Sequence, residues 1–401
     1  MKRFFKNFTL IDGTGNEPLN NAYLIVDGEK IDSVGFGEFD FDGEVVDLSG
    51  KFLMPGLINA HIHVTMDPVG NPLAEIETEA QTAFKAARNA KRHLDMGTTF
   101  VRDVGGKNYV DIDLRDAINN KLVEGAQMLV AGKNLAMTGG HGWQMGREVD
   151  GVDEARKGAR EQLRAGADLI KVMATGGVMT KGVEPGSPQM EEAEMRAAIE
   201  EAHKVGAKTA THAQGNTGIK NALRAGVDSI EHGIFLDEES IQMMLDNGTW
   251  LVPTLAAVDL IVKNSNTGEI PEYAVRKAKS VQASHIESVK KAYKAGVKIC
   301  NGTDSGTPYN YHGSAPYEAK LLMDIGMSPM EVLVASTKSS AECLGIEENY
   351  GTIEAGKFAD FIVLNENPLE NINTLFDIAD VYKLGEKVIR IFENPQKDEF
   401  K

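Results

Sequence analysis

Four of the nine histidines of this chain stand where a β-strand is expected to end. His61 and His63 lie two residues apart in the segment Asn-Ala-His-Ile-His (59–63), and residues two apart on a strand point to the same side. The pair could therefore chelate one metal ion, although two structural histidines would give the same pattern. His212 and His232 each close a later apolar run, where a metal ligand and an ordinary core or loop histidine are equally reasonable.

A lysine and an aspartate occupy comparable places. Lys171 lies inside the apolar run Leu-Ile-Lys-Val-Met (169–173), yet ionised lysines are seldom buried without a partner. It could pair with a carboxylate or extend to solvent. Carboxylated on its nitrogen, it would become an anion whose two oxygens could bridge two metals. Asp304 sits in a Gly-rich loop, where aspartate is commonly a turn residue. The coincidence of six such residues at strand ends favours one shared two-metal site.

The elements that must position these residues alternate between short β-type runs and longer helical stretches. The predicted strands are 58–64, 98–104, 126–131, 167–173, 207–212, 227–232, 249–254 and 297–303. The predicted helices include 74–96, 151–165, 191–205, 215–225 and 237–246. Eight strand–helix units over about 280 residues match an α/β fold, the (β/α)8 TIM barrel, whose reactive groups lie at the C-terminal ends of the strands. A doubly wound open sheet is the alternative, but it would gather its polar residues at one crevice.

Both ends of the chain read as β-structure instead. Period-two patterns with Gly and Asp breaks cover 3–12, 23–26, 30–35 and 44–48, and a β pattern returns at 351–364. We therefore expect residues 57–345 to form the barrel, and residues 1–56 and 346–401 to form a small β-sandwich domain.

Composition excludes several classes of function. The 42 Lys and Arg against 59 Asp and Glu give a formal net charge of −17, which argues against nucleic acid and anionic membranes as partners. The two cysteines make no disulfide framework. The N-terminal segment has no apolar core typical of a secretory signal, and no run approaches the roughly 20 apolar residues of a membrane span. We therefore expect a cytoplasmic protein. Independently of composition, we expect a homo-oligomer that acts on a small molecule.

The segment Leu-Met-Pro-Gly-Leu-Ile-Asn-Ala-His-Ile-His (53–63) and the segment Gly-Thr-Ile-Glu-Ala-Gly-Lys-Phe-Ala-Asp (351–360) resemble the amidohydrolase superfamily. Segments 101–106, 138–142 and 170–177 are similar to its imidazolonepropionase-related branch, which contains binuclear Xaa-Pro dipeptidases (prolidases) and carboxypeptidases that act on dipeptides. The resemblance covers nearly the whole chain.

This resemblance implies a role for each candidate. His61 and His63 would bind the more buried metal, His212 and His232 the other, and carboxylated Lys171 would bridge them. Asp304 would complete the site and act as acid/base, and His141 would touch the substrate carbonyl or carboxylate. The ions are expected to be zinc, with manganese or cobalt as alternatives. Imidazolonepropionase uses a single metal without a carboxylated lysine, so Lys171 argues against that activity.

The expected reaction is hydrolysis of the amide bond of a dipeptide or N-acyl amino acid, Xaa-Pro first among them. A metal-bridging hydroxide would attack the carbonyl, and Asp304 would carry the proton to the leaving amine. Another amide, a cyclic amide such as an imidazolonepropionase-like lactam, or a carbamate is the alternative within enzymes. A catalytically silent metal-binding scaffold is the alternative outside them, against which Asp304 and Lys171 speak.

Specificity is expected to reside in the loops. Candidate pocket walls are Met137, Trp143, Met179, Phe235 and residues 309–312 (Tyr-Asn-Tyr-His), and candidate carboxylate holders are Arg102, Arg147 and Lys181. Related enzymes that bind a substrate carboxylate place a Tyr after the sixth strand, where this chain has Ile234 and Phe235. The long segment 255–291 is either a lid or a plain extra helix.

Overall fold

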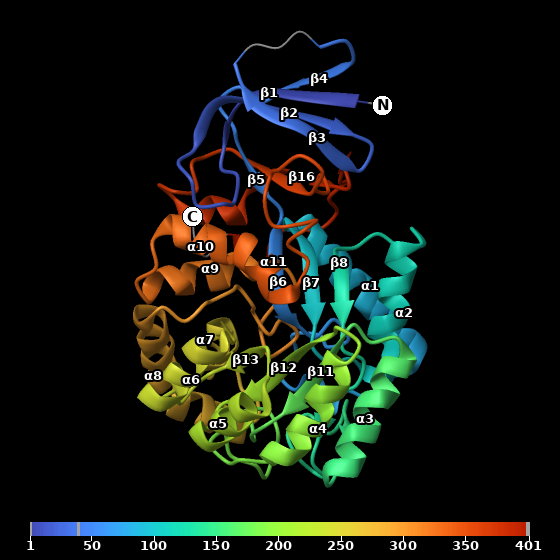
Figure 1. The fold of residues 1–401 in the computed structure, drawn as a ribbon, viewed down its shortest axis with the longest axis vertical. Coiled ribbons are helices and arrows are strands. Elements are labelled where there is room, and N and C mark those ends of the chain that lie inside the picture. Colours follow the sequence, from blue (N-terminus) through green and yellow to red (C-terminus); the bar gives the residue numbers. More distant parts are fainter. Residues whose placement is uncertain (1, 38–40, 398–401) are drawn as a thin grey trace.

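The computed structural model of the chain describes residues 2–37 and 41–397. A sheet built from both ends of the chain lies at one pole of the molecule, and parallel strands covered by helices make up the larger remainder (Figure 1). The fold is therefore α/β, as expected.

The sheet at this end of the molecule contains eight strands from both ends of the chain. Its order is β17-β16-β15-β5-β1-β2-β3, with β4 beside β1. The strands are β1 (Lys2–Leu10), β2 (Leu19–Asp27), β3 (Lys30–Phe36), β4 (Glu44–Asp47), β5 (Phe52–Pro55), β15 (Phe361–Leu364), β16 (Ile378–Lys383) and β17 (Glu386–Lys387). The two ends of the chain meet where β15 runs antiparallel to β5.

These strands form one continuous hydrogen-bonded sheet, and it has a core of its own in which the rings of Phe5, Phe361 and Tyr382 touch one another. The β pattern at 351–364 gives a strand only from Phe361 onward. Gly351 and Gly356 both have φ of 91°, a left-handed conformation that turns the chain out of a ladder. Residues 1, 38–40 and 398–401 of the predicted small domain lie outside the described part.

The parallel strands form two sheets. One has the order β6-β7-β8, and the other has the order β10-β9-β11-β12-β13-β14. The first contains β6 (Leu57–Ile62), β7 (Thr98–Asp103) and β8 (Gln127–Val130). The second contains β9 (Leu135–Ala136), β10 (Arg147–Glu148), β11 (Leu169–Met173), β12 (Lys208–Ala213), β13 (Ser229–His232) and β14 (Trp250–Val252). All predicted strands up to 249–254 are present within a few residues, and a hydrogen bond from Asp168 N to Val130 O (2.8 Å) joins the two sheets.

The predicted strand 297–303 is not a regular strand. Its backbone nevertheless bonds to both neighbours: Cys300 N donates to Leu251 O (3.1 Å), and Ala60 N donates to Asn301 O (2.8 Å). The segment therefore links β14 to β6. The segment ends at Asp304, where the chain turns with a positive φ of 60°.

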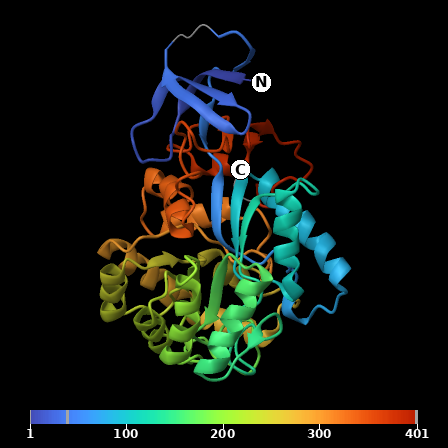
Figure 2. The ribbon, with the colours of Figure 1, turned by 45° about the vertical axis from the view of Figure 1, so that its right-hand side comes forward.

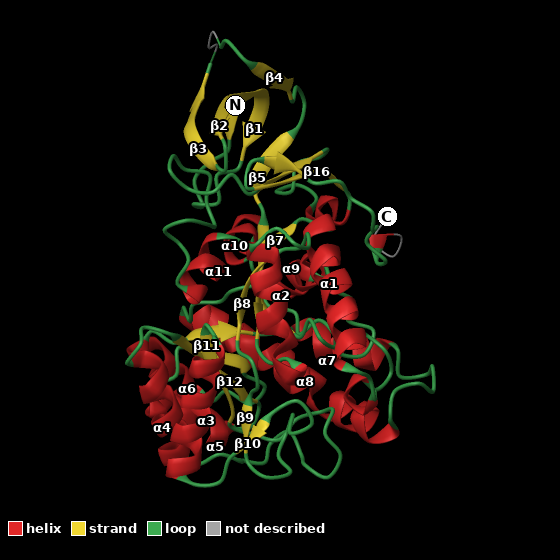
Figure 3. Cartoon of the chain, turned by 90° about the vertical axis from the view of Figure 1, so that its right-hand side faces the viewer, coloured by secondary structure: helices red, strands yellow, loops and turns green. Residues whose placement is uncertain are grey.

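Helices surround the parallel strands (Figures 2 and 3). They are α1 (Glu79–Asp95), α2 (Val110–Asn119), α3 (Val152–Ala165), α4 (Glu192–His203), α5 (Asn216–Ala225), α6 (Glu238–Asn247), α7 (Leu255–Lys263), α8 (Glu272–Ala295), α9 (Ala315–Asp324), α10 (Pro329–Ala335) and α11 (Lys338–Leu344). Their apolar faces pack on the strands in one core that contains Val172, Ile230, Ala198 and Ala222. Among the described residues, no helix combines the length and apolar character that crossing a bilayer requires.

Two predicted elements differ from the structure in an instructive way. The predicted helix 74–96 begins only at Glu79, because the Thr78 side chain accepts a hydrogen bond from Gln81 N and caps the helix there. The segment 255–291 became two helices, α7 and most of α8, and α8 spans 24 residues.

Candidate metal centre and active site

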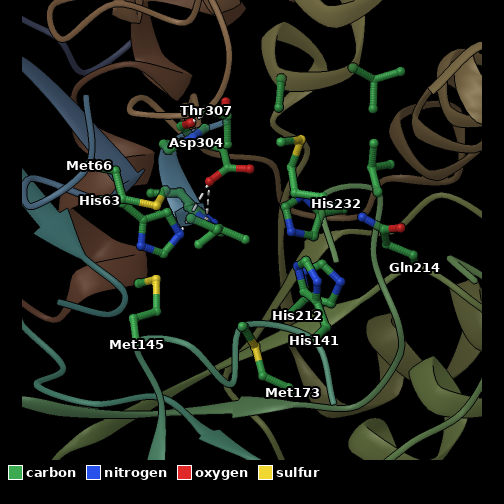
Figure 4. Close-up of a pocket in the computed structure, with 18 of the residues that line it drawn as sticks. His63, Met66, His141, Met145, Met173, His212, Gln214, His232, Asp304 and Thr307 are labelled. Carbon is green, nitrogen blue, oxygen red and sulfur yellow. Dashed lines mark hydrogen bonds and ion pairs between the residues drawn. The ribbon is translucent and has the colours of Figure 1, made fainter. Parts of the chain in front are cut away.

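All six predicted ligands and His141 line a single cavity (Figure 4). The ligands are buried and come from the ends of the parallel strands and from the loops that follow: His61 on β6, His63 one residue beyond it, Lys171 within β11, His212 on β12, His232 at the end of β13, and Asp304 in the turn after 297–303. The fold thus brings together residues that are far apart in the sequence.

Asp304 is the point on which the first pair converges. Its Oδ1 lies 3.3 Å from Nε2 of His61 and 3.3 Å from Nε2 of His63. Ligand atoms of His61, His232 and Asp304 all lie within 4.8 Å of one another, and the ring centroids of His212 and His232 are 4.5 Å apart. These nitrogen and oxygen atoms are thus close enough together to coordinate a metal ion between them.

Hydrogen bonds on the side away from Asp304 orient the rings of His61 and His63. Nδ1 of His61 bonds to Oε2 of Glu231 (2.7 Å), and Nδ1 of His63 bonds to the carbonyl oxygen of Gly105 (2.8 Å). Each bond uses Nδ1 and leaves Nε2 facing Asp304. A metal-binding histidine commonly donates its other ring nitrogen to a carboxylate or carbonyl in this way, which fixes tautomer and ring angle.

The second pair follows the same rule. Nδ1 of His232 contacts Oγ1 of Thr254 (2.6 Å), which leaves Nε2 free, and Nε2 of His212 contacts the carbonyl oxygen of Gly176 (3.2 Å), which leaves Nδ1 free. His232, Thr254 and Asp304 have positive φ of 73°, 53° and 60°, unusual for residues with a Cβ. Strained backbone conformations of this kind cluster at functional sites, where the position of the side chain matters more than the backbone energy. These donors therefore fit divalent metal ions.

Glu231 and Arg102 form a buried ion pair beneath the site. Oε1 of Glu231 accepts from Nη2 of Arg102 (2.8 Å) and from Oγ of Ser229 (2.6 Å), while Nε of Arg102 donates to the carbonyl oxygen of Ala60 (2.6 Å). Burial alone would raise the pKa of Glu231, but the Arg102 charge and the His61 hydrogen bond hold that pKa well below its usual range. Glu231 is therefore an anion that orients His61.

Lys171 is fully enclosed at the centre of the cavity wall. Burial lowers the pKa of its amine to about 8, although the carboxylates of Glu231 and Asp304 act in the opposite direction. Near pH 8 a large fraction of this amine is therefore neutral, whereas a surface lysine is almost entirely protonated at that pH.

His141 reaches the cavity from the loop after β9. Its Nδ1 lies 2.8 Å from Oγ1 of Thr180, and its ring centroid lies 4.2 Å from that of His212. Burial lowers the pKa of His141 to about 3, so the ring is neutral. Thr180 Oγ1 accepts a hydrogen bond from Gly142 N (3.4 Å) and can donate its own proton to Nδ1. With the Thr180 hydroxyl as donor, the ring proton of His141 would sit on Nε2.

The loop that carries Thr180 is fixed by α8. Nζ of Lys277 donates to three of its backbone carbonyls, at Gly177 (3.2 Å), Thr180 (2.7 Å) and Val183. The loop presses against His141: a Cβ added at Gly177 would lie 2.5 Å from the His141 ring. The segment 255–291 therefore supplies a structural support for this loop.

Most of the remaining cavity wall is apolar. It is lined by Met66, Pro72, Leu73, Met145, Met173, Val178, Met179, Ala257, Val258 and Ile261. Of the predicted wall residues, only Met179 is among them. Met137, Phe235 and residues 309–312 do not line the cavity, and Trp143 is 46% exposed.

The three predicted carboxylate holders do not face the cavity. Arg102 is buried against Glu231, Arg147 pairs with Glu154 (2.7 Å) and Glu161 (2.9 Å) of α3, and Lys181 is exposed. Among the described residues that line the cavity, Lys171 is the one lysine or arginine. These three predictions were wrong, because the sequence does not show to which side of the chain a basic side chain in a loop points.

Sequence reasoning also missed the supporting residues Glu231, Thr254 and Thr180. Glu231 gave a usable signal, since an acid inside the buried run Ser-Ile-Glu-His (229–232) is as unusual as a lysine inside 169–173. Thr254 and Thr180 gave none, because a threonine in a loop is ordinary.

Comparison with known proteins agrees with this geometry. The model of the amidohydrolase family matches residues 52–388. Ochratoxinase of Aspergillus niger is 30% identical over 96% of this chain and 85% of its own length. A solved Xaa-Pro dipeptidase with methionine bound in its active site is 33% identical, covers 97% of this chain and 100% of that chain, and gives a TM-score of 0.91. A prolidase solved with N-methylphosphonate-L-proline is 30% identical, covers 98% and 100%, and gives the same TM-score. The chain belongs to the amidohydrolase family and is a hydrolase that acts on carbon–nitrogen bonds of amides.

Proposed function

We propose that this protein is a two-metal hydrolase of dipeptides or N-acyl amino acids, similar to Xaa-Pro dipeptidases. One observation carries the proposal: each of the four histidines is anchored through one ring nitrogen, and all four line the same cavity. The other ring nitrogen of His61 and of His63 lies 3.3 Å from Asp304. In this arrangement His61 and His63 would hold one ion and His212 and His232 the other. Zinc suits these ligands best, and manganese or cobalt would fit the same set.

Lys171 is proposed to bridge the two ions as a carbamate. Its lowered pKa supports this, because the unprotonated amine is the form that reacts with carbon dioxide. Without carboxylation, a lysine beside two cations would either repel them or stand neutral.

The chemistry divides between the ions and the chain. Bound divalent ions lower the pKa of water and polarise a carbonyl. Asp304 then accepts the proton of the attacking water and returns it to the leaving amine, because its carboxylate faces the cavity beside both His61 and His63. His141 donates from Nε2 to the carbonyl oxygen as negative charge develops there.

The apolar wall supports substrates with an apolar group beside the scissile amide. Four methionines, Met66, Met145, Met173 and Met179, are flexible enough to adapt to different side chains. The Xaa-Pro dipeptidase and the prolidase among the similar structures support a dipeptide, and the ochratoxinase similarity together with this apolar wall favours a bulky apolar amide as second candidate.

A substrate library tests the proposal. Metal-loaded protein is offered Xaa-Pro, Xaa-Arg and Xaa-Lys dipeptides and N-acyl amino acids with small or apolar side chains. We expect hydrolysis of members with an apolar side chain and loss of it in Asp304→Asn. Hydrolysis confined to cyclic amides or carbamates, or no hydrolysis of any amide by protein with full metal content, would contradict the proposal.

We also propose that the parallel strands close into a (β/α)8 barrel over residues 57–345, and that residues 1–56 and 346–401 form the small β domain. A cytoplasmic homo-oligomer that binds neither nucleic acid nor membrane stays our prediction from the charge and composition of the chain.

A further inference from the structure

One polar side chain in the cavity has no task in the chemistry above. The polar residues that line the cavity are four metal-site histidines, His141, Lys171, Asp304, Thr307 and Gln214. Thr307 donates its hydroxyl to the carbonyl oxygen of Asp304 (2.7 Å) and so supports the turn. Gln214 remains.

Gln214 is held firmly by its backbone but not by its side chain. Its N–H donates to Oγ1 of Thr175 (3.0 Å), and its carbonyl oxygen accepts from Phe235 N (3.0 Å), so the loops after β11, β12 and β13 meet at this residue. The side chain is 4% exposed, and its Oε1 is buried without a hydrogen-bond partner. A buried polar group left unpaired destabilises the fold, so its retention here calls for an explanation.

The amide faces the cavity with its donor end. Figure 4 shows the amide nitrogen of Gln214 turned toward His232 and the open part of the cavity, with the oxygen turned away. An amide nitrogen is a donor of two hydrogen bonds, so the group it awaits is an acceptor. The cavity also lacks any arginine, and its one lysine belongs to the metal site, so no side-chain cation among the described lining residues is left for a substrate anion.

We propose that Gln214 binds the carboxylate of the substrate and is the specificity-determining contact for amides that carry a free carboxylate, as N-acyl amino acids and dipeptides do. The inference rests on the proposed function, since it assigns one end of that substrate. A neutral donor suits this place, because an added cation beside two divalent ions would be repelled, whereas an amide donates to the carboxylate without net charge.

Binding experiments test the inference separately from turnover. Affinities of metal-loaded protein for N-acetyl-L-methionine and for its carboxamide are measured by titration calorimetry under conditions in which neither is consumed, or in Asp304→Asn if both are hydrolysed. The two ligands differ only in the carboxylate. Wild-type protein is expected to prefer the carboxylate, and Gln214→Leu to lose about 10- to 100-fold for it with less than about 3-fold change for the carboxamide, as expected for a hydrogen bond to a charged group.

Gln214→Glu is the second variant and keeps the shape of the side chain. It is expected to reverse the preference, because its carboxylate repels the substrate carboxylate and accepts from the carboxamide. Gln162→Leu is the matched control: Gln162 is also a buried glutamine, but it bonds to Gly158 O and Lys133 N and does not line the cavity. It is expected to lower stability without changing the ratio of the two affinities.

The inference is overturned if wild-type protein does not discriminate between the two ligands, or if the Gln214 variants weaken both equally. It stands if the ratio changes as described even when wild-type protein hydrolyses neither ligand. In that case the proposed substrate class fails, and Gln214 is still a carboxylate-binding residue.

Discussion

The buried pair of Arg102 and Glu231 gives the sharpest quantitative prediction. Both side chains are essentially inaccessible to water, and Glu231 satisfies three donors at once: Arg102 (2.8 Å), Ser229 (2.6 Å) and His61 (2.7 Å). The perturbation is a double-mutant cycle made of Arg102→Met, Glu231→Gln and the combined variant.

Each single change leaves one charge in the interior without its partner. Such a loss costs about 3–5 kcal/mol, because the remaining ion cannot recover its hydration. The combined variant buries neither charge, so we expect its loss of stability to be smaller than the sum of the single losses by about 2–4 kcal/mol.

Unfolding of the metal-free proteins in urea at pH 7 measures these free energies. A second readout separates the roles of the two residues. Variants that carry Glu231→Gln are expected to bind metal about 10–100-fold more weakly, because His61 loses its anionic acceptor, while Arg102→Met retains it. If the single losses add within about 0.5 kcal/mol, the two residues are not coupled and the reasoning fails.

Three further predictions concern catalysis and stability. Asp304→Asn is expected to lower kcat by about 10²–10⁴-fold, measured with bound metal determined on the same sample; unchanged kcat would remove Asp304 from the proton transfer. Thr180→Val is expected to lower kcat by about 10–100-fold without loss of metal, because His141 loses the hydroxyl that sets its tautomer; an unchanged rate would contradict that role. Hydrogen bonds from Arg160 and then from Lys204 lower the pKa of Glu201 to about 2, so this carboxylate stabilises the fold above pH about 4.5 and loses that effect as pH falls toward 2. Glu201→Gln should therefore cost about 1 kcal/mol at pH 7 and little at about pH 2 in urea unfolding; a loss independent of pH would point to packing instead.

That the six candidate ligands gather at one cavity could be predicted, because strand geometry constrains them. His61 and His63 had to share a side, and residues that close parallel strands had to meet at one end of the fold. The position of the segment 297–303 between its neighbours could be predicted from its apolar residues. Its irregular pairing could not be predicted, since it depends on contacts with β6 and β14.

The cavity wall was largely beyond sequence reasoning. Loop residues follow no fixed period, so the sequence could not predict that Trp143 and Phe235 do not line the cavity. Gln214 lies two residues after His212 on the same strand end, and period-two geometry could have placed it beside that ligand. Its type gave no further signal, because a neutral glutamine near a strand end is less unusual than a buried charged residue.

Anomalous diffraction from crystals of metal-loaded protein, grown with bicarbonate, tests the two-metal site most directly. The account predicts two divalent ions in the cavity, one beside His61 and His63 and one beside His212 and His232, with continuous density from Lys171 to both. A single ion, an ion elsewhere, or an unmodified Lys171 between two ions would contradict it.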